Sequence, residues 1–114
     1  VDVALDAFPY TGGDSAAAAL AEGVPFVTLC GQRHAERVAT SILTHLGITD
    51  TIARTEDEYV AIAVALATDS HRRGALAERI RAALPRDNAS AMEAYTRNFE
   101  AALERAWQRG TGTQ

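Results

Sequence analysis

The sequence contains only one cysteine, Cys30, among its 114 residues. A single cysteine cannot form a disulfide bond within the chain, and no second cysteine or close histidine gives it the spacing of a zinc site. Stability must therefore come from a packed core, and we expect a reducing, cytoplasmic setting.

Long apolar runs and blocks of positive charge are also absent. A membrane-spanning helix needs about 18 consecutive apolar residues, and Gly23 and Pro25 interrupt the most apolar stretch. The 11 basic residues are interleaved with 15 acidic ones, giving a net charge of −4, whereas nucleic-acid binding needs concentrated positive charge. We expect a soluble globular protein that binds neither a membrane nor nucleic acid.

An initial methionine is missing as well. The chain opens on the apolar run Val1 to Leu5, with neither the basic region nor the cleavage site of a signal peptide before it. We therefore expect residues 1–114 to be a single fragment, the trailing part of a longer protein.

A strand, a turn and a helix are predicted at the start of the chain. The apolar run at 1–5 leads into a turn at 7–13 that contains Pro9 and two glycines. Asp14 or Ser15 is expected to cap a helix that runs to about residue 22.

A second strand-to-helix unit follows the first. Residues 24–29 are β-branched and aromatic, as in a central strand covered on both faces. Apolar residues then recur at helical spacing over 33–46 and stop at Gly47, and a short edge strand is expected at 51–53. The predicted fold class is α/β, a partial Rossmann-like parallel sheet of few strands whose missing strands precede Val1.

The second half of the chain is predicted to be helical. Thr55 with Glu58, Ser70, and Ser90 with Glu93 are the expected capping positions of three helices. The last helix carries an apolar stripe of core or docking residues: Met92, Tyr95, Phe99, Leu103 and Trp107. The chain thus divides into an α/β part at 1–54, C-terminal helices at 55–109 and a tail at 110–114.

The Gly12-Gly13 turn is the main candidate for chemistry. A strand that enters a glycine turn and then a helix brings main-chain amides close to a ligand, and the helix dipole there favours an anion such as phosphate. The alternative is a plain structural turn. Asp14 favours that alternative, because its carboxylate can cap the helix and would repel a phosphate.

The second loop, 30–34, should face the same crevice, because both loops follow the carboxyl ends of parallel strands. Arg33 or His34 could reach a ligand there, although a solvated helical face explains them equally well. The acidic run at 56–58 fits the first turn of a helix. No nucleophile motif, Walker-type loop or metal-ligand spacing is found.

Several segments together resemble a known family. They read VALDAFPYTGG at 3–13, GVPFVTL at 23–29, GQRHAERV at 31–38 and EYVAIA at 58–63. This pattern closely resembles the C-terminal end of the bacterial O-linked N-acetylglucosamine transferase and SPINDLY-like glycosyltransferases, and the likeness covers nearly the whole chain.

The resemblance implies a GT-B architecture, with two Rossmann-like lobes, commonly preceded by tetratricopeptide repeats. This chain would be the last part of the donor-binding lobe. Gly13, Asp14 and Ser15 would meet the diphosphate of a UDP-sugar, and with Gly12 and Arg33 they form the candidate binding set. No metal or cofactor is expected. The family's general base and main diphosphate lysine lie upstream, so no catalytic residue is assigned here and the fragment alone should be inactive.

Two departures from the family pattern leave a second hypothesis open. Family members usually have threonines where this chain has Asp14 and Ala16, and a ribose-binding aspartate where it has Ala18. The parent is therefore expected either to transfer a sugar, N-acetylglucosamine by resemblance, to protein Ser or Thr, or to be a degenerate lobe used for protein interaction. A free-standing nucleotide-binding domain would need a full strand set. The exposed sheet edge of the fragment could also pair in a homodimer.

Overall fold

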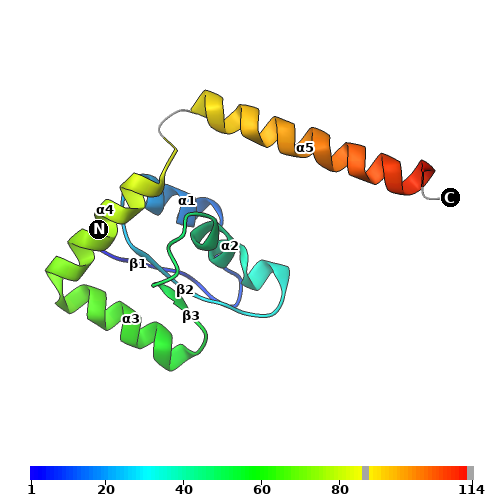
Figure 1. The fold of residues 1–114 in the computed structure, drawn as a ribbon. Helices are drawn as coiled ribbons and strands as arrows, with labels where there is room; N and C mark the ends of the chain where they lie inside the picture. Colours follow the sequence, from blue (N-terminus) through cyan, green and yellow to red (C-terminus); the bar gives the residue numbers. More distant parts are fainter. Residues whose placement is uncertain (86–87, 113–114) are drawn as a thin grey trace. The chain divides into compact units, whose positions relative to one another are not determined.

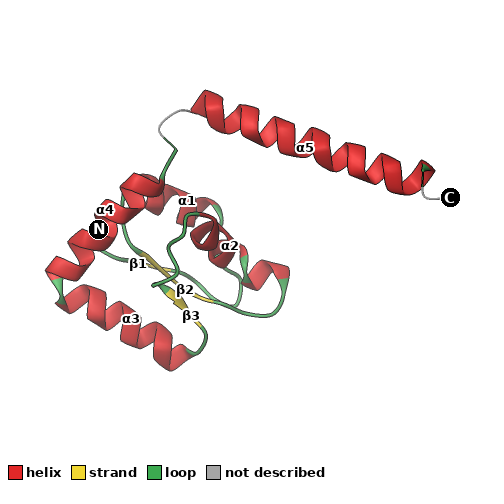
Figure 2. Cartoon of the chain, viewed as in Figure 1, coloured by secondary structure: helices red, strands yellow, loops and turns green. Residues whose placement is uncertain are grey.

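The computed structural model describes residues 1–85 and 88–112 and divides into two compact units, at 1–84 and 85–114. Unit 1 contains three short strands and most of the helices, and unit 2 contains one long helix (Figures 1 and 2). In unit 1 the elements are β1 Ala4–Leu5, α1 Asp14–Ala21, β2 Phe26–Leu29, η1 His34–Glu36, α2 Val38–His45, β3 Ile52–Ala53, α3 Glu56–Thr68 and α4 Ser70–Ala83. Unit 2 is α5 Asn88–Thr111.

The sheet has the strand order β1-β2-β3, and both pairs are parallel. Ala4 pairs with Phe26, and Thr28 pairs with Ile52. The central strand β2 is almost wholly buried, which its β-branched and aromatic composition predicted. The predicted α/β class, with a parallel sheet of few strands, is confirmed.

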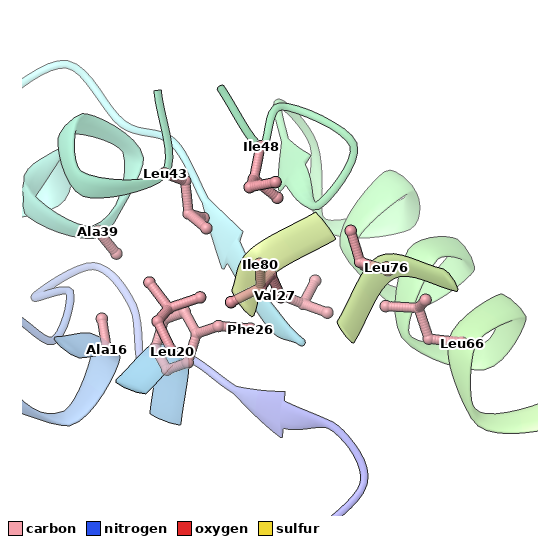
Figure 3. Packing of buried hydrophobic residues seen from close by; sticks show 10 residues of the cluster. All are labelled: Ala16, Leu20, Phe26, Val27, Ala39, Leu43, Ile48, Leu66, Leu76 and Ile80. Atoms are coloured by element: carbon pink, nitrogen blue, oxygen red, sulfur yellow. The ribbon is translucent and has the colours of Figure 1, made fainter. Parts of the chain in front are cut away.

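The core of unit 1 forms where helices pack on β2. Figure 3 shows side chains from α1, α2 and α4 that converge on Phe26 and Val27. Leu20, Leu43 and Ile80 are at most 1% exposed, and burial of each stabilises the fold by about 1.5–3 kcal/mol. This packing fixes α1, and therefore the turn that precedes it, against the sheet.

Glycine ends α1 and α2 in the same way. Gly23 and Gly47 have φ angles of 75° and 74°, in the left-handed region that only glycine adopts freely. In α1 the amide of Val24 then bonds back to the carbonyl of Ala19, the Schellman arrangement that satisfies terminal carbonyls. Both stops were predicted from the sequence.

The cap predicted at Thr55 is confirmed, since its hydroxyl accepts a 3.1 Å hydrogen bond from the Glu58 amide at the start of α3. The caps predicted for α1 and α4 differ from the observed N-cap positions by one or two residues. Gly13 occupies the N-cap of α1, and no side chain caps that helix within the described ranges. Asp14 is already helical, whereas a capping residue needs non-helical angles to direct its side chain back onto the amides. For the same reason Asp69, and not Ser70, caps α4. The helix α5 begins at Asn88, which places Ser90 inside it.

The single helix expected over 33–46 is in fact two elements, η1 and α2. The amides of Glu36 and Arg37 bond to carbonyls three residues back, and Arg37, with φ −127°, interrupts the helix before Val38. A tighter 3₁₀ turn therefore precedes the α-helix.

The long helix α5 carries the apolar stripe that its periodicity predicted. Its large apolar side chains are between 56% and 71% exposed: Met92, Tyr95, Phe99, Leu103 and Trp107. The helix extends to Thr111, into the predicted tail at 110–114, of which 113–114 lie outside the described residues. None of the helices in the described ranges combines the length and apolar composition needed to cross a bilayer.

Candidate functional site

Three loops meet at one edge of the sheet, because each follows the carboxyl end of a parallel strand. The loop after β1 contains the glycine turn, the loop after β2 leads into η1, and the loop after β3 leads into α3. Thr11 joins the first two, since its amide and its hydroxyl both donate to the carbonyl of Ala35 at 2.9 Å. The loops after β1 and β2 therefore contact each other directly.

The carboxylate of Asp6 lies under the glycine turn. Oδ1 accepts a 2.8 Å hydrogen bond from the Gly12 amide, and Oδ2 accepts a 2.7 Å hydrogen bond from the Thr28 hydroxyl. Asp6 is only 5% exposed, and these two donors compensate for removing its charge from water. The Gly12 amide is consequently directed inward and not toward a ligand.

The outer side of the turn is accessible. Gly12 and Gly13 are half-buried, and Asp14 and Ser15 are exposed. The amides at the start of a helix lack intrahelical partners, and within residues 1–85 and 88–112 no side chain caps those of α1. The carboxylate of Asp14 thus leaves the amides open, and the helix dipole adds partial positive charge there. This geometry suits a bound anion.

Both glycines of the turn sit close to neighbouring side chains. A Cβ at Gly12 would overlap Oγ of Ser15 and would lie 3.3 Å from Oδ1 of Asp6. A Cβ at Gly13 would lie 3.4 Å from Cγ1 of Val38, an ordinary contact distance. The Ser15 hydroxyl therefore lies directly over Gly12, beside the uncapped amides.

The loop after β2 is organised by Glu36. Its Oε2 accepts 2.9 Å hydrogen bonds from the amides of Gln32 and Arg33. The main-chain hydrogen bond from Arg33, followed by the one from Gln32, lowers the pKa of the Glu36 carboxyl below its ordinary value. Glu36 thus stays ionised and fixes the backbone at the start of η1.

Arg33 is exposed, and its guanidinium forms no ion pair or hydrogen bond with the part of the chain that the structure describes. The Arg33 amide donates to the carboxylate of Glu36, which fixes the backbone there. Two residues later, the Ala35 carbonyl accepts the hydrogen bond from Thr11. Arg33 is therefore on the loop that contacts the glycine turn, with a side chain available to a ligand.

A hollow of about 650 Å³ lies along η1 and α2. Its lining includes one arginine, two histidines and several hydroxyl side chains but no acidic residue: His34, Arg37, Val38, Thr40, Ser41, Ile42, Thr44 and His45. Val38 links it to the turn, as the residue nearest the Cβ position of Gly13. The surroundings of the turn on this side thus favour negative charge.

A second hollow, of about 610 Å³, lies among the loops that follow the three strands. Phe8 and Pro9 line one part, and Cys30 and Arg54 line another. A guanidinium nitrogen of Arg54 is 3.7 Å from the Cys30 sulfur. Among the described residues no group of three His, Cys, Asp or Glu side chains is arranged to hold a metal ion.

Three residues that support this site were not predicted from the sequence: Asp6, Thr28 and Tyr59. Their signals were weak but present. Asp6 directly follows a strand and precedes a glycine turn, and Thr28 is a hydroxyl within an otherwise apolar strand. Tyr59 lies 53 residues after Asp6, and its hydroxyl donates to the Asp6 carbonyl at 2.8 Å.

Comparisons with known proteins agree with one another. Residues 1–99 match the family model of glycosyl transferase family 41. The chain is 38% identical over 109 residues to the probable UDP-N-acetylglucosamine–peptide N-acetylglucosaminyltransferase SPINDLY of Hordeum vulgare. It is 33% identical over 108 residues to the UDP-N-acetylglucosamine–peptide N-acetylglucosaminyltransferase of Caenorhabditis elegans.

A solved structure is similar to the chain as well. A mutant of the Thermobaculum terrenum O-GlcNAc transferase is 38% identical, with a TM-score of 0.77 over 96% of this chain and 20% of that one. The chain spans only 12% of the barley relative and 9% of the nematode relative. Similarity is therefore established for one segment of much longer proteins.

Proposed function

The chain belongs to glycosyl transferase family 41, and from this premise we propose that it is the last part of the donor-binding lobe of a GT-B glycosyltransferase. The resemblance seen in the sequence is confirmed. The proposed donor is UDP-N-acetylglucosamine, and the proposed acceptors are Ser and Thr hydroxyls of proteins. We further propose that the parent is bacterial and cytoplasmic, with tetratricopeptide repeats.

The observation that supports this proposal is the uncapped first turn of α1. Asp14 and Ser15 of this turn are exposed, the Ser15 hydroxyl lies over Gly12, and the hollow along η1 and α2 contains Arg37 and two histidines but no acid. A diphosphate supplies the anionic oxygens that such donors bind. Arg33, on the adjoining loop, is proposed to add positive charge.

The proposed chemical role of the first turn of α1 is to stabilise negative charge that develops during sugar transfer. When a hydroxyl displaces UDP from the sugar, negative charge grows on the leaving diphosphate. Preorganised amide and hydroxyl donors stabilise that charge more strongly in the transition state than in the ground state. With such donors in place the proposed reaction needs no metal or cofactor. The catalytic groups are proposed to lie upstream, and the fragment alone is proposed to be inactive.

A second candidate function is supported by Asp14 and Ala18. Asp14 brings an exposed carboxylate to the first turn of α1, where it would repel a diphosphate, and Ala18 lacks the ribose-binding carboxylate that family members usually have. Loss of one charge-assisted hydrogen bond weakens binding by about 1.5–3 kcal/mol. These residues favour a non-catalytic module used for protein interaction.

Nucleotide titration of the full-length protein separates the two functions. We expect UDP and UDP-N-acetylglucosamine to bind by calorimetry, and uridine to bind more weakly because it lacks the diphosphate. Ser15→Ala should weaken UDP binding by about tenfold, equivalent to about 1.4 kcal/mol. Ser70→Ala is the matched control, because Ser70 is the first residue of another helix, whose first turn Asp69 already caps.

Absence of UDP binding by the wild-type protein would overturn the donor-site assignment and favour the interaction module. Equal losses of UDP affinity in Ser15→Ala and Ser70→Ala would also count against the donor-site assignment. Nucleotide binding without transfer to any protein acceptor would limit the proposal to binding.

A further inference from the structure

We propose that Asp6 is a positioning residue for this site: its buried carboxylate holds the glycine turn so that the first-turn amides of α1 face the diphosphate. This inference rests on the proposed function above. Asp6 is directed into the protein, away from the accessible side of the turn, and so acts through Gly12 and not on the ligand.

Asp6 is fixed on several sides. Its amide donates to the carbonyl of Val27 at 2.9 Å, and its carbonyl accepts from the Tyr59 hydroxyl at 2.8 Å. Its Oδ2 is bonded to Thr28 in the central strand. The residue is thus immobilised by β2 and α3 independently of the turn.

This fixed carboxylate directs the turn. Oδ1 holds the Gly12 amide at 2.8 Å, and two residues later the chain enters α1. Because Gly12 has no side chain, the Ser15 hydroxyl can lie over it. A movement of Gly12 would therefore displace both the hydroxyl of Ser15 and the first amides of the helix.

The negative charge of Asp6 does not itself favour a bound diphosphate. A carboxylate behind an anion site opposes anion binding by its Coulomb field, so its charge is of no benefit to a diphosphate. Its benefit must be geometric, through the hydrogen bond to Gly12. Asparagine retains an oxygen acceptor for the Gly12 amide and an amide that can donate to the Thr28 hydroxyl. A positioning role therefore predicts that Asp6→Asn preserves binding and that Asp6→Ala does not.

The test compares UDP and uridine binding in the full-length protein. We expect Asp6→Ala to weaken UDP binding by about tenfold or more, with a change of less than about threefold for uridine. Asp6→Asn should bind UDP as tightly as wild type or more tightly. Val27→Ala is the control for general destabilisation, since it creates a cavity in β2 but keeps the main-chain bond to Asp6.

The outcomes are distinguishable. If wild type binds no UDP, the proposed function and this inference both fail. If wild type binds UDP and Asp6→Ala binds it equally well, or loses UDP and uridine affinity to the same extent as Val27→Ala, only the positioning role fails. If circular dichroism shows Asp6→Ala to be unfolded, Asp6→Glu replaces it. The longer side chain should displace Gly12, and retained UDP affinity would refute the inference.

Discussion

The phenolic hydroxyl of Tyr59 donates a 2.8 Å hydrogen bond to the main-chain carbonyl of Asp6. The Tyr59 ring also meets the Phe8 ring edge to face, with centroids 5.2 Å apart and an interplanar angle of 75°. One side chain of α3 therefore contacts both the start and the middle of the loop that leads to the glycine turn. The helix α3 is thereby part of the site's support.

Tyr59→Phe is expected to remove the hydrogen bond and retain the ring contact. The expected cost is about 1 kcal/mol of unfolding free energy, measured by urea denaturation. Burial, and secondarily the charge of Asp6, raises the pKa of the Tyr59 phenol above its ordinary value. The stability that the protonated Tyr59 phenol contributes is fully present below the unfolded-state pKa of about 10, and it is lost as the pH rises through the folded-state pKa. Tyr59→Phe should reduce that alkaline loss, and an unchanged alkaline slope would contradict the assignment.

Gly12→Ala tests the packing of the turn. The new Cβ would overlap Oγ of Ser15 and crowd Oδ1 of Asp6, so we expect a loss of about 1–3 kcal/mol in thermal unfolding, typical of overpacking. The double variant Gly12→Ala with Ser15→Ala should recover part of that loss, because it removes the overlapping hydroxyl. Gly13→Ala, whose Cβ finds an ordinary 3.4 Å contact, is the control. A smaller loss for Gly12→Ala than for Gly13→Ala would contradict the packing described here.

Acid sensitivity is expected to involve Glu36. Its pKa is lowered by hydrogen bonds from the amides of Arg33 and Gln32. A lowered carboxyl pKa contributes stability above the unfolded-state value, near 4.3, and that stability is lost as the pH falls through the folded-state pKa. Glu36→Gln should therefore show a smaller fall in unfolding free energy between about pH 5 and pH 3. Glu22→Gln, a change at an exposed glutamate at the end of α1, should keep the wild-type dependence of unfolding free energy on pH. If the unfolding free energy falls equally with pH in the wild type and in both variants, Glu36 has no such role in acid sensitivity.

Alanine substitution at two glycines outside the site should change the stability of the protein in opposite directions. Gly47 has a φ of 74°, so Gly47→Ala should cost about 1 kcal/mol or more through backbone strain. Gly74 lies inside α4, and no described atom beyond its own helix and chain neighbours lies within 4 Å of its Cβ position. Gly74→Ala should stabilise the protein by about 0.5–1 kcal/mol. Melting temperatures that shift in the same direction would contradict this difference.

The ion pair between Asp50 and Arg79 is expected to contribute little. Both nitrogen–oxygen distances are 2.9 Å, but the side chains remain 43% and 50% exposed. The Arg79 hydrogen bond lowers the pKa of Asp50, and solvent screens the pair. A double-mutant cycle with Asp50→Asn and Arg79→Gln should give a coupling of about 0.2–1 kcal/mol that decreases with salt. A coupling that is large and independent of salt would contradict this.

The local features of the fold were predictable. The β-branched and aromatic composition of 24–29 predicted a buried strand, and Gly23 and Gly47 marked the ends of the preceding and following helices. The family was also evident from the order and spacing of short segments. Helix starts were less predictable, because Asp14 and Asp69 show that the capping position depends on where the backbone becomes helical.

The amino-acid sequence by itself determined the strands and helices, the glycine stops and the membership of a glycosyltransferase family, because these depend on local conformational preference and on residue order. Only the tertiary structure decided that the Gly12 amide is bound to Asp6 and that the amides of α1 are left open. Asp6 meets Thr28 and Tyr59 across separations of 22 and 53 residues. Such contacts form only when β1, β2 and α3 pack together, which no local pattern specifies.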